Sequence, residues 1–179
     1  MPPDDTGRGP IPLGPVGGYL IENLRDLRNR RRLSFKDLAD RLEELGRPIP
    51  TLGLSRIERG NRRVDADDLV ALALALGVNP TALLLPRNTA PDELVDLTAD
   101  YQATARDAWN WADARASLPY AGPGTRSTMD WQAEADFVSH GRPLWAPLPE
   151  GLQALGFQRQ PEESHDDHVT GPERPDAAS

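Results

Sequence analysis

The segment Ser34–Gly60 constrains the fold of this 179-residue chain more strongly than any other stretch. The apolar residues of its first half recur at helical spacing: Phe35, Leu38, Leu42 and Leu45. In its second half, Leu54 and Ile57 are three residues apart, as on one face of a helix. Between the two halves, residues 46–50 contain a glycine and two prolines, which terminate helices. The segment therefore predicts two short helices joined by a turn.

Helix-boundary signals extend this pattern to five predicted helices between residues 17 and 86. Ser34, Asp65 and Asn79 are of the type that caps a helix N-terminus, and Pro80 suits a first helical position. Asp37 lies three residues after Ser34, as in a capping box. The expected ranges, caps included, are about 19–32, 34–46, 51–60, 65–77 and 79–86.

Composition divides the rest of the chain into three parts. Residues 1–16 are rich in proline and glycine and are expected to form a flexible N-terminal arm. Residues 87–157 are expected to be a helical and irregular C-terminal region, with one helix over about 87–118. Residues 158–179 are polar and acidic, which predicts a disordered tail because they cannot bury enough apolar surface. The expected fold class is all-α: a five-helix domain, additional C-terminal helices and the tail.

Charge is distributed unevenly along the chain, whose formal net charge is −8 at pH 7. Residues 17–76 contain 12 Lys and Arg against 10 Asp and Glu, whereas the rest contains 8 against 18. The helical domain is therefore mildly basic and its flanks are acidic. Because electrostatic fields decay over about 10 Å at moderate salt, the local excess decides whether the domain can contact phosphate.

The predicted helix 51–60 carries a mixed face opposite Leu54 and Ile57. This face combines hydroxyls, a branched apolar side chain and a guanidinium, on Thr51, Leu52, Ser55 and Arg56. An arginine can pair with O6 and N7 of guanine, a leucine can contact a thymine methyl, and hydroxyls can donate to bases or phosphates. The pattern favours base contacts by these four residues in the DNA major groove. The alternative is an ordinary solvated surface, with Thr51 only a cap.

Further polar and cationic side chains follow this helix. Arg59, Asn61, Arg62 and Arg63 lie at or just beyond its predicted end. Side chains of this kind contact DNA phosphates and set affinity rather than sequence preference. A solvated charge run is the alternative, and the position beside a candidate recognition helix favours phosphate contact.

Four short motifs, in their order and spacing, give the domain a family resemblance. They are L-R-x-L-R at Leu24–Arg28, L-S-x-x-x-L-A at Leu33–Ala39, L-S-R-I-E-R-G at Leu54–Gly60 and D-L-V-A-L-A-L-A-L-G-V at Asp68–Val78. The segment from about Tyr19 to Pro86 resembles the lambda-repressor-like helix-turn-helix family of the Xre type. The resemblance implies a five-helix domain whose second and third helices read double-stranded DNA, and a homodimer on paired half-sites.

The resemblance also implies one ion pair. The chain departs from the family pattern at two places. Glu58 would repel phosphate from within the recognition helix, and in the family pattern the residue aligned with Arg28 pairs with it. The turn between the second and third helices is longer than the family's short form by roughly five residues. Phe35 stands where many members have a glutamine that contacts phosphate, so this contact is either lost or supplied by Lys36 or Arg47.

The C-terminal region carries a narrow apolar stripe and a concentration of tryptophan. The stripe comprises Leu94, Leu97, Tyr101, Ala105, Ala108 and Ala112, and the tryptophans are Trp109, Trp111, Trp131 and Trp145. Aromatic side chains dominate many interfaces, which favours a dimer contact or a surface for a protein or effector partner. A satellite core packed on the fifth helix is the alternative.

Catalytic, metal-binding and membrane functions have little support in the sequence. The absence of cysteine excludes a disulfide, a thiolate zinc site and a cysteine nucleophile. His165 and His168 flank two aspartates in the polar tail, where no scaffold would hold a metal ion. The longest apolar run, residues 69–78, is too short to cross a bilayer. Residues 1–14 show no secretory signal pattern, and no cofactor is expected.

These features together predict a cytoplasmic, nucleoid-associated transcriptional regulator that binds DNA sequence-specifically and is not an enzyme. The first alternative is a non-catalytic protein-interaction module on the same fold, antitoxin-like or a regulatory partner. In that case Leu52 and the tryptophans would contact protein. The second alternative is an enzyme with a helix-turn-helix appendage, which the missing nucleophile and metal cluster oppose.

Overall fold

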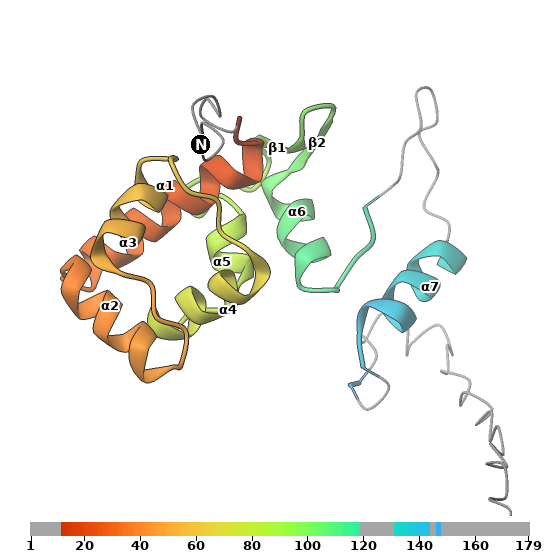
Figure 1. The fold of residues 1–179 in the computed structure, drawn as a ribbon. Coiled ribbons are helices and arrows are strands. Elements are labelled where there is room, and N and C mark those ends of the chain that lie inside the picture. Colours follow the sequence, from red (N-terminus) through yellow and green to blue (C-terminus); the bar gives the residue numbers. More distant parts are fainter. Residues whose placement is uncertain (1–11, 119–130, 144–145, 148–179) are drawn as a thin grey trace, which may run out of the picture.

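The computed structural model describes residues 12–118, 131–143 and 146–147 (Figure 1). Five helices form the N-terminal part of the described chain: α1 (Pro15–Arg30), α2 (Phe35–Glu44), α3 (Thr51–Glu58), α4 (Ala66–Ala75) and α5 (Thr81–Leu84). They are followed by the strands β1 (Leu94–Thr98) and β2 (Tyr101–Thr104) and the helices α6 (Ala105–Ala112) and α7 (Trp131–Gly141). The predicted tail 158–179 and most of the predicted arm 1–16 lie outside the described residues.

The starts of α2 and α4 follow from their capping residues. The Ser34 hydroxyl accepts the backbone N–H of Asp37 at 3.1 Å, and the Asp37 carboxylate accepts the backbone N–H of Ser34 at 2.8 Å. Asp65 accepts the N–H of Asp68 at 2.7 Å. Hydrogen bonds from the Ser34 hydroxyl and backbone lower the pKa of Asp37, and the Asp68 N–H lowers the pKa of Asp65. The contribution of each carboxylate to its cap is therefore fully present above the unfolded-state pKa and is lost as the pH falls through the lower folded-state pKa.

Helix α1 starts earlier than the sequence predicted, at Pro15 rather than near Tyr19. Proline is favoured in a first helical turn because the N–H that it lacks has no helical partner there. Gly17 and Gly18 then continue the helix despite their low helix propensity. Gly17 also admits Leu13, since a Cβ at Gly17 would lie 3.1 Å from a Leu13 methyl. Residues 15 and 16 therefore belong to the helical domain and not to an arm.

The core of this domain draws apolar side chains from α1 to α5 and from the α2–α3 turn. Its fully buried members are Leu24, Leu38, Leu42, Ile49, Leu54, Ile57, Leu72, Leu76 and Leu83. Ile49 belongs to the turn, so the long Gly/Pro segment is packed into the core rather than lying loosely on the surface. Gly46 ends α2 with a φ of 75°, a conformation that favours glycine.

Residues 87–118 do not form one helix, and the fold is therefore not all-α. The strands β1 and β2 pair antiparallel with Val95 opposite Ala103, and only Ala105–Ala112 within this stretch is helical. Along each strand the buried residue, Val95 or Ala103, stands between more exposed neighbours. A short apolar run can fit a helical or a strand period, and the β-branched and aromatic residues here favour strands. The molecule is mostly helical with a small two-stranded sheet.

A second, smaller core joins this hairpin to the helical domain. Its buried members are Leu85, Val95, Ala103, Ala105 and Ala108. The backbone N–H of Asp96 donates to the Tyr19 hydroxyl at 3.1 Å, which links β1 to α1. Thr104 caps α6 by accepting the N–H of Asp107 at 3.1 Å. This Thr-x-x-Asp pattern repeats the Ser34–Asp37 signal and could have located the start of α6 from the sequence.

The tryptophans occupy different environments. Trp109 is part of the second core, and its indole N–H donates to the Pro86 carbonyl at 3.1 Å. Trp111 is 41% exposed. Trp131 begins α7, but its side chain, like the whole of Trp145, lies outside the part of the chain described in detail. The structure thus supports the satellite-core interpretation for Trp109, and a partner-binding role for Trp111 stays a prediction.

Asn23 is the buried polar residue that joins α1 to the end of α5. Its side chain is almost inaccessible, and its amide donates to the carbonyls of Leu83 at 3.2 Å and Leu85 at 2.8 Å. Carbonyls at a helix C-terminus lack helical partners and need another donor when they are buried. Asn23 supplies that donor and so fixes α5 against α1.

We expect Asn23→Ala to lower the free energy of unfolding by about 1–3 kcal/mol, because two interior carbonyls lose their donor. Urea denaturation of the full chain measures this change. Asn29→Ala on the exposed side of the same helix is the matched control and should have little effect. Equal losses in the two variants would contradict the role assigned to Asn23.

Candidate nucleic-acid interface

Helix α3 has one buried and one exposed face. Leu54 and Ile57 are fully buried, and Glu58 at the C-terminal end is 6% exposed. On the opposite side Thr51 and Arg56 are exposed, Leu52 is 58% exposed and Ser55 is half-buried. The residues predicted to contact bases thus lie together on the outer face of one short helix. A hydroxyl, an apolar branched side chain and a guanidinium can all interact with the edges of bases from such a position.

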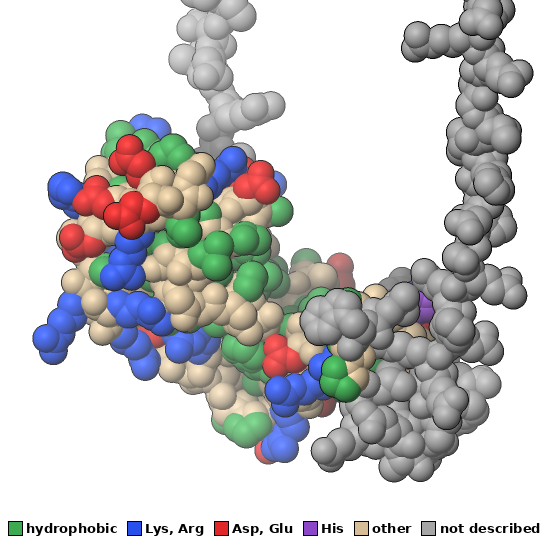
Figure 2. Space-filling model, turned by 90° about the horizontal axis from the view of Figure 1, so that it is seen from below, with side chains coloured by type: hydrophobic (Ala, Val, Ile, Leu, Met, Phe, Trp, Pro, Cys, Tyr) green, Lys and Arg blue, Asp and Glu red, His purple; other side chains and the backbone are tan. Residues whose placement is uncertain are grey.

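The residues after α3 extend this face with polar side chains. Arg59 donates to the Ser55 hydroxyl at 2.7 Å, so its side chain lies along the helix surface. Asn61 is exposed, and Arg63 donates to the Pro12 carbonyl at 3.4 Å. Lys36, in the first turn of α2, is exposed and pairs with Asp40 one turn later. Figure 2 shows Lys and Arg side chains along one side of the helical domain, with Asp and Glu side chains grouped beside them.

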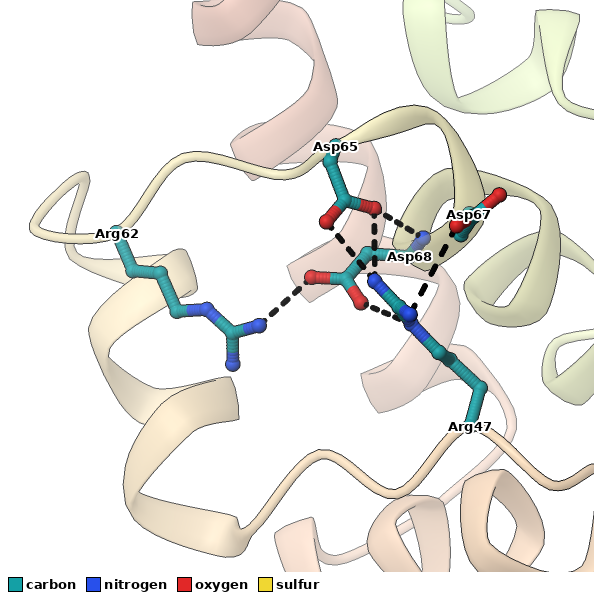
Figure 3. Close-up of polar contacts among 5 residues, drawn as sticks. All are labelled: Arg47, Arg62, Asp65, Asp67 and Asp68. Carbon is teal, nitrogen blue, oxygen red and sulfur yellow. Dashed lines mark hydrogen bonds and ion pairs between the residues drawn. The ribbon is translucent and has the colours of Figure 1, made fainter.

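Arg47 and Arg62 are paired with a buried carboxylate, unlike the other cations predicted to bind phosphate, of which Lys36 pairs with the exposed Asp40. Arg47 Nε lies 2.8 Å from Asp68 Oδ1, and its Nη2 lies 2.9 Å from Asp65 Oδ2 (Figure 3). Arg62 Nη2 lies 2.7 Å from Asp68 Oδ2. Asp68 is 1% exposed, whereas the side chains of Arg47 and Arg62 are 40% and 36% exposed. The buried Asp68 carboxylate therefore accepts from Arg47 on one oxygen and from Arg62 on the other.

Gly53 leaves the space beside α3 that the Arg62 side chain occupies. A Cβ at this position would lie 2.8 Å from Arg62 Nη1 and 3.1 Å from an Ile49 methyl. A separation below 3.0 Å is too close for ordinary carbon packing, so any larger residue would displace the guanidinium or the turn. Glycine is an unfavourable residue inside a helix, and here the close approach of Arg62 accounts for it.

Arg28 and Glu58 form a bidentate ion pair between α1 and the end of α3. Arg28 Nε and Nη2 lie 2.6 Å and 3.0 Å from the two carboxylate oxygens of Glu58. The hydrogen bond to Glu58 raises the pKa of the Arg28 guanidinium. Both side chains are largely removed from solvent. The pair ties the recognition-helix candidate to α1.

Three neighbours complete the environment of this pair. Arg28 lies over the Phe35 ring with its guanidinium carbon 4.3 Å from the ring centroid, which is a cation–π contact. Arg28 also donates to the Leu33 carbonyl at 2.9 Å. Arg25 donates to the backbone carbonyl of Glu58 at the end of α3. Phe35 thus supports Arg28 where a phosphate-binding side chain would be expected from the family resemblance.

No sequence pattern predicted the Arg47–Asp68–Arg62 group. In the run Asp65-Ala66-Asp67-Asp68, local spacing predicts only that Asp65 caps a helix. The sequence did contain one relevant signal: three carboxylates within four residues follow shortly after a pair of arginines. The partners are 21 and 6 residues apart, however, and sequence spacing alone does not bring Arg47 to this turn.

The described residues contain no group of three or more His, Asp or Glu side chains placed to hold a metal ion. His165 and His168 lie outside them. No helix within the described ranges is long and apolar enough to cross a membrane.

We expect Glu58→Ala and Arg28→Ala each to destabilise the fold by about 3 kcal/mol, because each leaves the other charge buried without its partner. Thermal and urea unfolding measure the losses. In the double variant the loss should be clearly smaller than the sum of the two, which is the signature of direct coupling. Lys36→Ala, which breaks an exposed pair, is the control and should change little. Strict additivity in the cycle would contradict the coupling.

Comparison with known proteins relates this chain to a family. A model of the helix-turn-helix domain matches residues 22–85, which run from within α1 to the end of α5. The HTH-type transcriptional regulator DdrOP3 of Deinococcus deserti is 30% identical over 120 residues, covering 63% of this chain and 89% of that protein. No solved structure matches the chain. The chain therefore belongs to the family of helix-turn-helix transcriptional regulators.

Proposed function

We propose that this chain is a sequence-specific DNA-binding transcriptional regulator of the lambda-repressor-like Xre type, with α3 as the recognition helix. One observation carries the proposal: Thr51, Leu52 and Arg56 are exposed together on a helix whose other face is buried and anchored through Glu58. A helix that presents a short polar and apolar face on a fixed scaffold can enter the major groove. The family relationship supports the same function.

Base recognition is assigned to Thr51, Leu52, Ser55 and Arg56. Arg56 would donate to O6 and N7 of a guanine, and Leu52 would contact a thymine methyl. Arg56 forms no ion pair with the described residues, so its guanidinium is available for a base. The hydroxyls of Thr51 and Ser55 would donate to a base or to the backbone.

Phosphate contacts are assigned to Lys36, in the first turn of α2, and to Arg59, Asn61 and Arg63, which follow the C-terminal end of α3. Cations and amides at such positions fix the register of the protein on the duplex. The acidic surface elsewhere on the chain does not prevent this, because its field is screened beyond about 10 Å.

The remaining features of the proposal concern assembly and location. A homodimer on paired half-sites would double the number of base contacts and is the usual arrangement for this motif. A cytoplasmic, nucleoid-associated location and the absence of catalytic activity follow from the same function.

A protein-interaction module remains the second candidate, and the exposed apolar residues favour it. Leu52 is 58% exposed and Trp111 is 41% exposed, and both could anchor a protein partner. Selection from a random duplex library with the purified full chain, followed by fluorescence anisotropy, separates the two functions. Enrichment of one sequence supports the DNA-binding regulator, and the absence of any preferred duplex supports the interaction module.

We expect Arg56→Ala to cost about 1–3 kcal/mol of binding free energy on the selected site and to relax preference at one base pair. Arg56→Lys keeps the charge but loses the bidentate geometry, so it should recover little of that preference. Anisotropy titrations on the selected duplex and its single-base variants measure both effects. A uniform loss on every sequence would make Arg56 a backbone contact.

Salt dependence tests the phosphate contacts. Arg63→Ala should reduce the slope of log affinity against log salt concentration by about 0.9, because one phosphate contact and its released counterions are lost. Arg106→Ala on α6 removes an exposed arginine far along the chain and should leave the slope unchanged. A slope that Arg63→Ala does not change would remove Arg63 from the interface.

A further inference from the structure

Asp68 binds two arginines at once from the first turn of α4. It is the most buried of the ionisable residues in the described part of the chain, with 1% of its surface exposed. One carboxylate oxygen accepts from Arg47 Nε at 2.8 Å and the other from Arg62 Nη2 at 2.7 Å (Figure 3). Charge-assisted hydrogen bonds of this kind are strong, and loss of a partner leaves a buried charge poorly satisfied.

The two arginines come from the two segments that border α3. Arg47 lies in the turn before the helix and Arg62 lies in the loop after it. A single carboxylate on α4 therefore ties both ends of α3 to the same point. Gly53 is part of the arrangement, because a Cβ there would lie 2.8 Å from Arg62 Nη1. Since α3 has only eight residues, such external attachments decide its orientation more than its own hydrogen bonds do.

The local charge makes this group a poor site for a DNA phosphate. Arg47 also lies 2.9 Å from Asp65 and 3.8 Å from Asp67, so two guanidinium groups face three carboxylates. Three nearby arginines form no ion pair with any described carboxylate: Arg56, Arg59 and Arg63. A phosphate bound to Arg62 would lie close to the Asp68 carboxylate and compete with it for the guanidinium, whereas these three arginines can bind one without disturbing a buried ion pair.

We propose that Arg47 and Arg62 hold α3 in place through Asp68 and do not bind phosphate, which makes Asp68 a positioning residue for the recognition helix. The inference rests on the proposed DNA-binding function and refines it. It replaces the expectation from sequence that both arginines contact the DNA backbone. Sequence preference then depends on a carboxylate that does not touch the DNA and whose charge would oppose binding.

Salt-dependent anisotropy on the selected duplex and on a scrambled one tests this assignment, with all variants measured at a temperature where they are folded. Arg62→Ala and Asp68→Asn should each reduce the preference for the selected duplex by about tenfold or more, because α3 is misplaced. Neither should change the slope of log affinity against log salt. Arg63→Ala is the control and should lower that slope by about 0.9 while keeping the preference.

The double variant Asp68→Asn/Arg62→Ala provides a second criterion. If the two residues act through each other, the double variant should lose little more preference than either single variant. A reduction of the slope by about 0.9 in Arg62→Ala would show a phosphate contact and would overturn the proposal. Fully additive losses of preference would overturn it as well.

Hydrogen exchange of the full chain without DNA tests the positioning role independently of DNA binding. Amides of residues 51–58 should exchange at least about tenfold faster in Arg62→Ala and Asp68→Asn, because local opening of α3 becomes easier. Those of α1 should change much less. If α3 exchange is unaffected in Arg62→Ala, the proposal is wrong, even where Asp68→Asn fails to fold. If exchange responds as expected but the wild type prefers no duplex, the proposed function is wrong and the attachment of α3 stands.

Discussion

The attachment of α3 by buried carboxylates is the interaction on which the rest of this molecule depends. An eight-residue helix is not stable on its own in water, because nucleation is costly and few backbone hydrogen bonds follow. Leu54 and Ile57 bury one face of α3, and two groups of ion pairs fix the orientation of the helix. Glu58 joins the C-terminal end of α3 to Arg28 on α1, and Asp68 joins both flanking segments to α4. The exposed face of α3 is therefore presented at a fixed angle.

This arrangement separates the arginines around α3 into two kinds. Arg28, Arg47 and Arg62 donate to buried carboxylates, where planar guanidinium groups make several directed hydrogen bonds. Arg56, Arg59 and Arg63 are exposed at the surface. The domain as a whole carries only a small positive excess, so total charge is a poor guide to its interface. In the proposed function, the cations that are not held by a buried carboxylate, rather than all cations near the helix, contact phosphate.

The hairpin and α6 pack against the end of α5, and β1 also contacts α1. Leu85 and the Trp109–Pro86 hydrogen bond attach the second core directly to the end of α5. The sequence prediction of one helix over 87–118 was wrong because the apolar stripe fits two periods over so short a length. Pairing of Val95 with Ala103 and contact with α1 decided between them, and neither is visible in local spacing.

The sequence by itself determined the local features: the helix starts at Ser34, Asp65 and Asn79, and the polar face of α3. Their causes lie within three or four residues, so spacing is enough to predict them. The Arg28–Glu58 pair, 30 residues apart, was expected only through a family resemblance. Tertiary structure alone decided the hairpin, the burial of Ile49 in the turn and the sharing of Asp68 by Arg47 and Arg62. Each of these depends on which distant segments meet, and a buried carboxylate is stable only where that meeting supplies its partners.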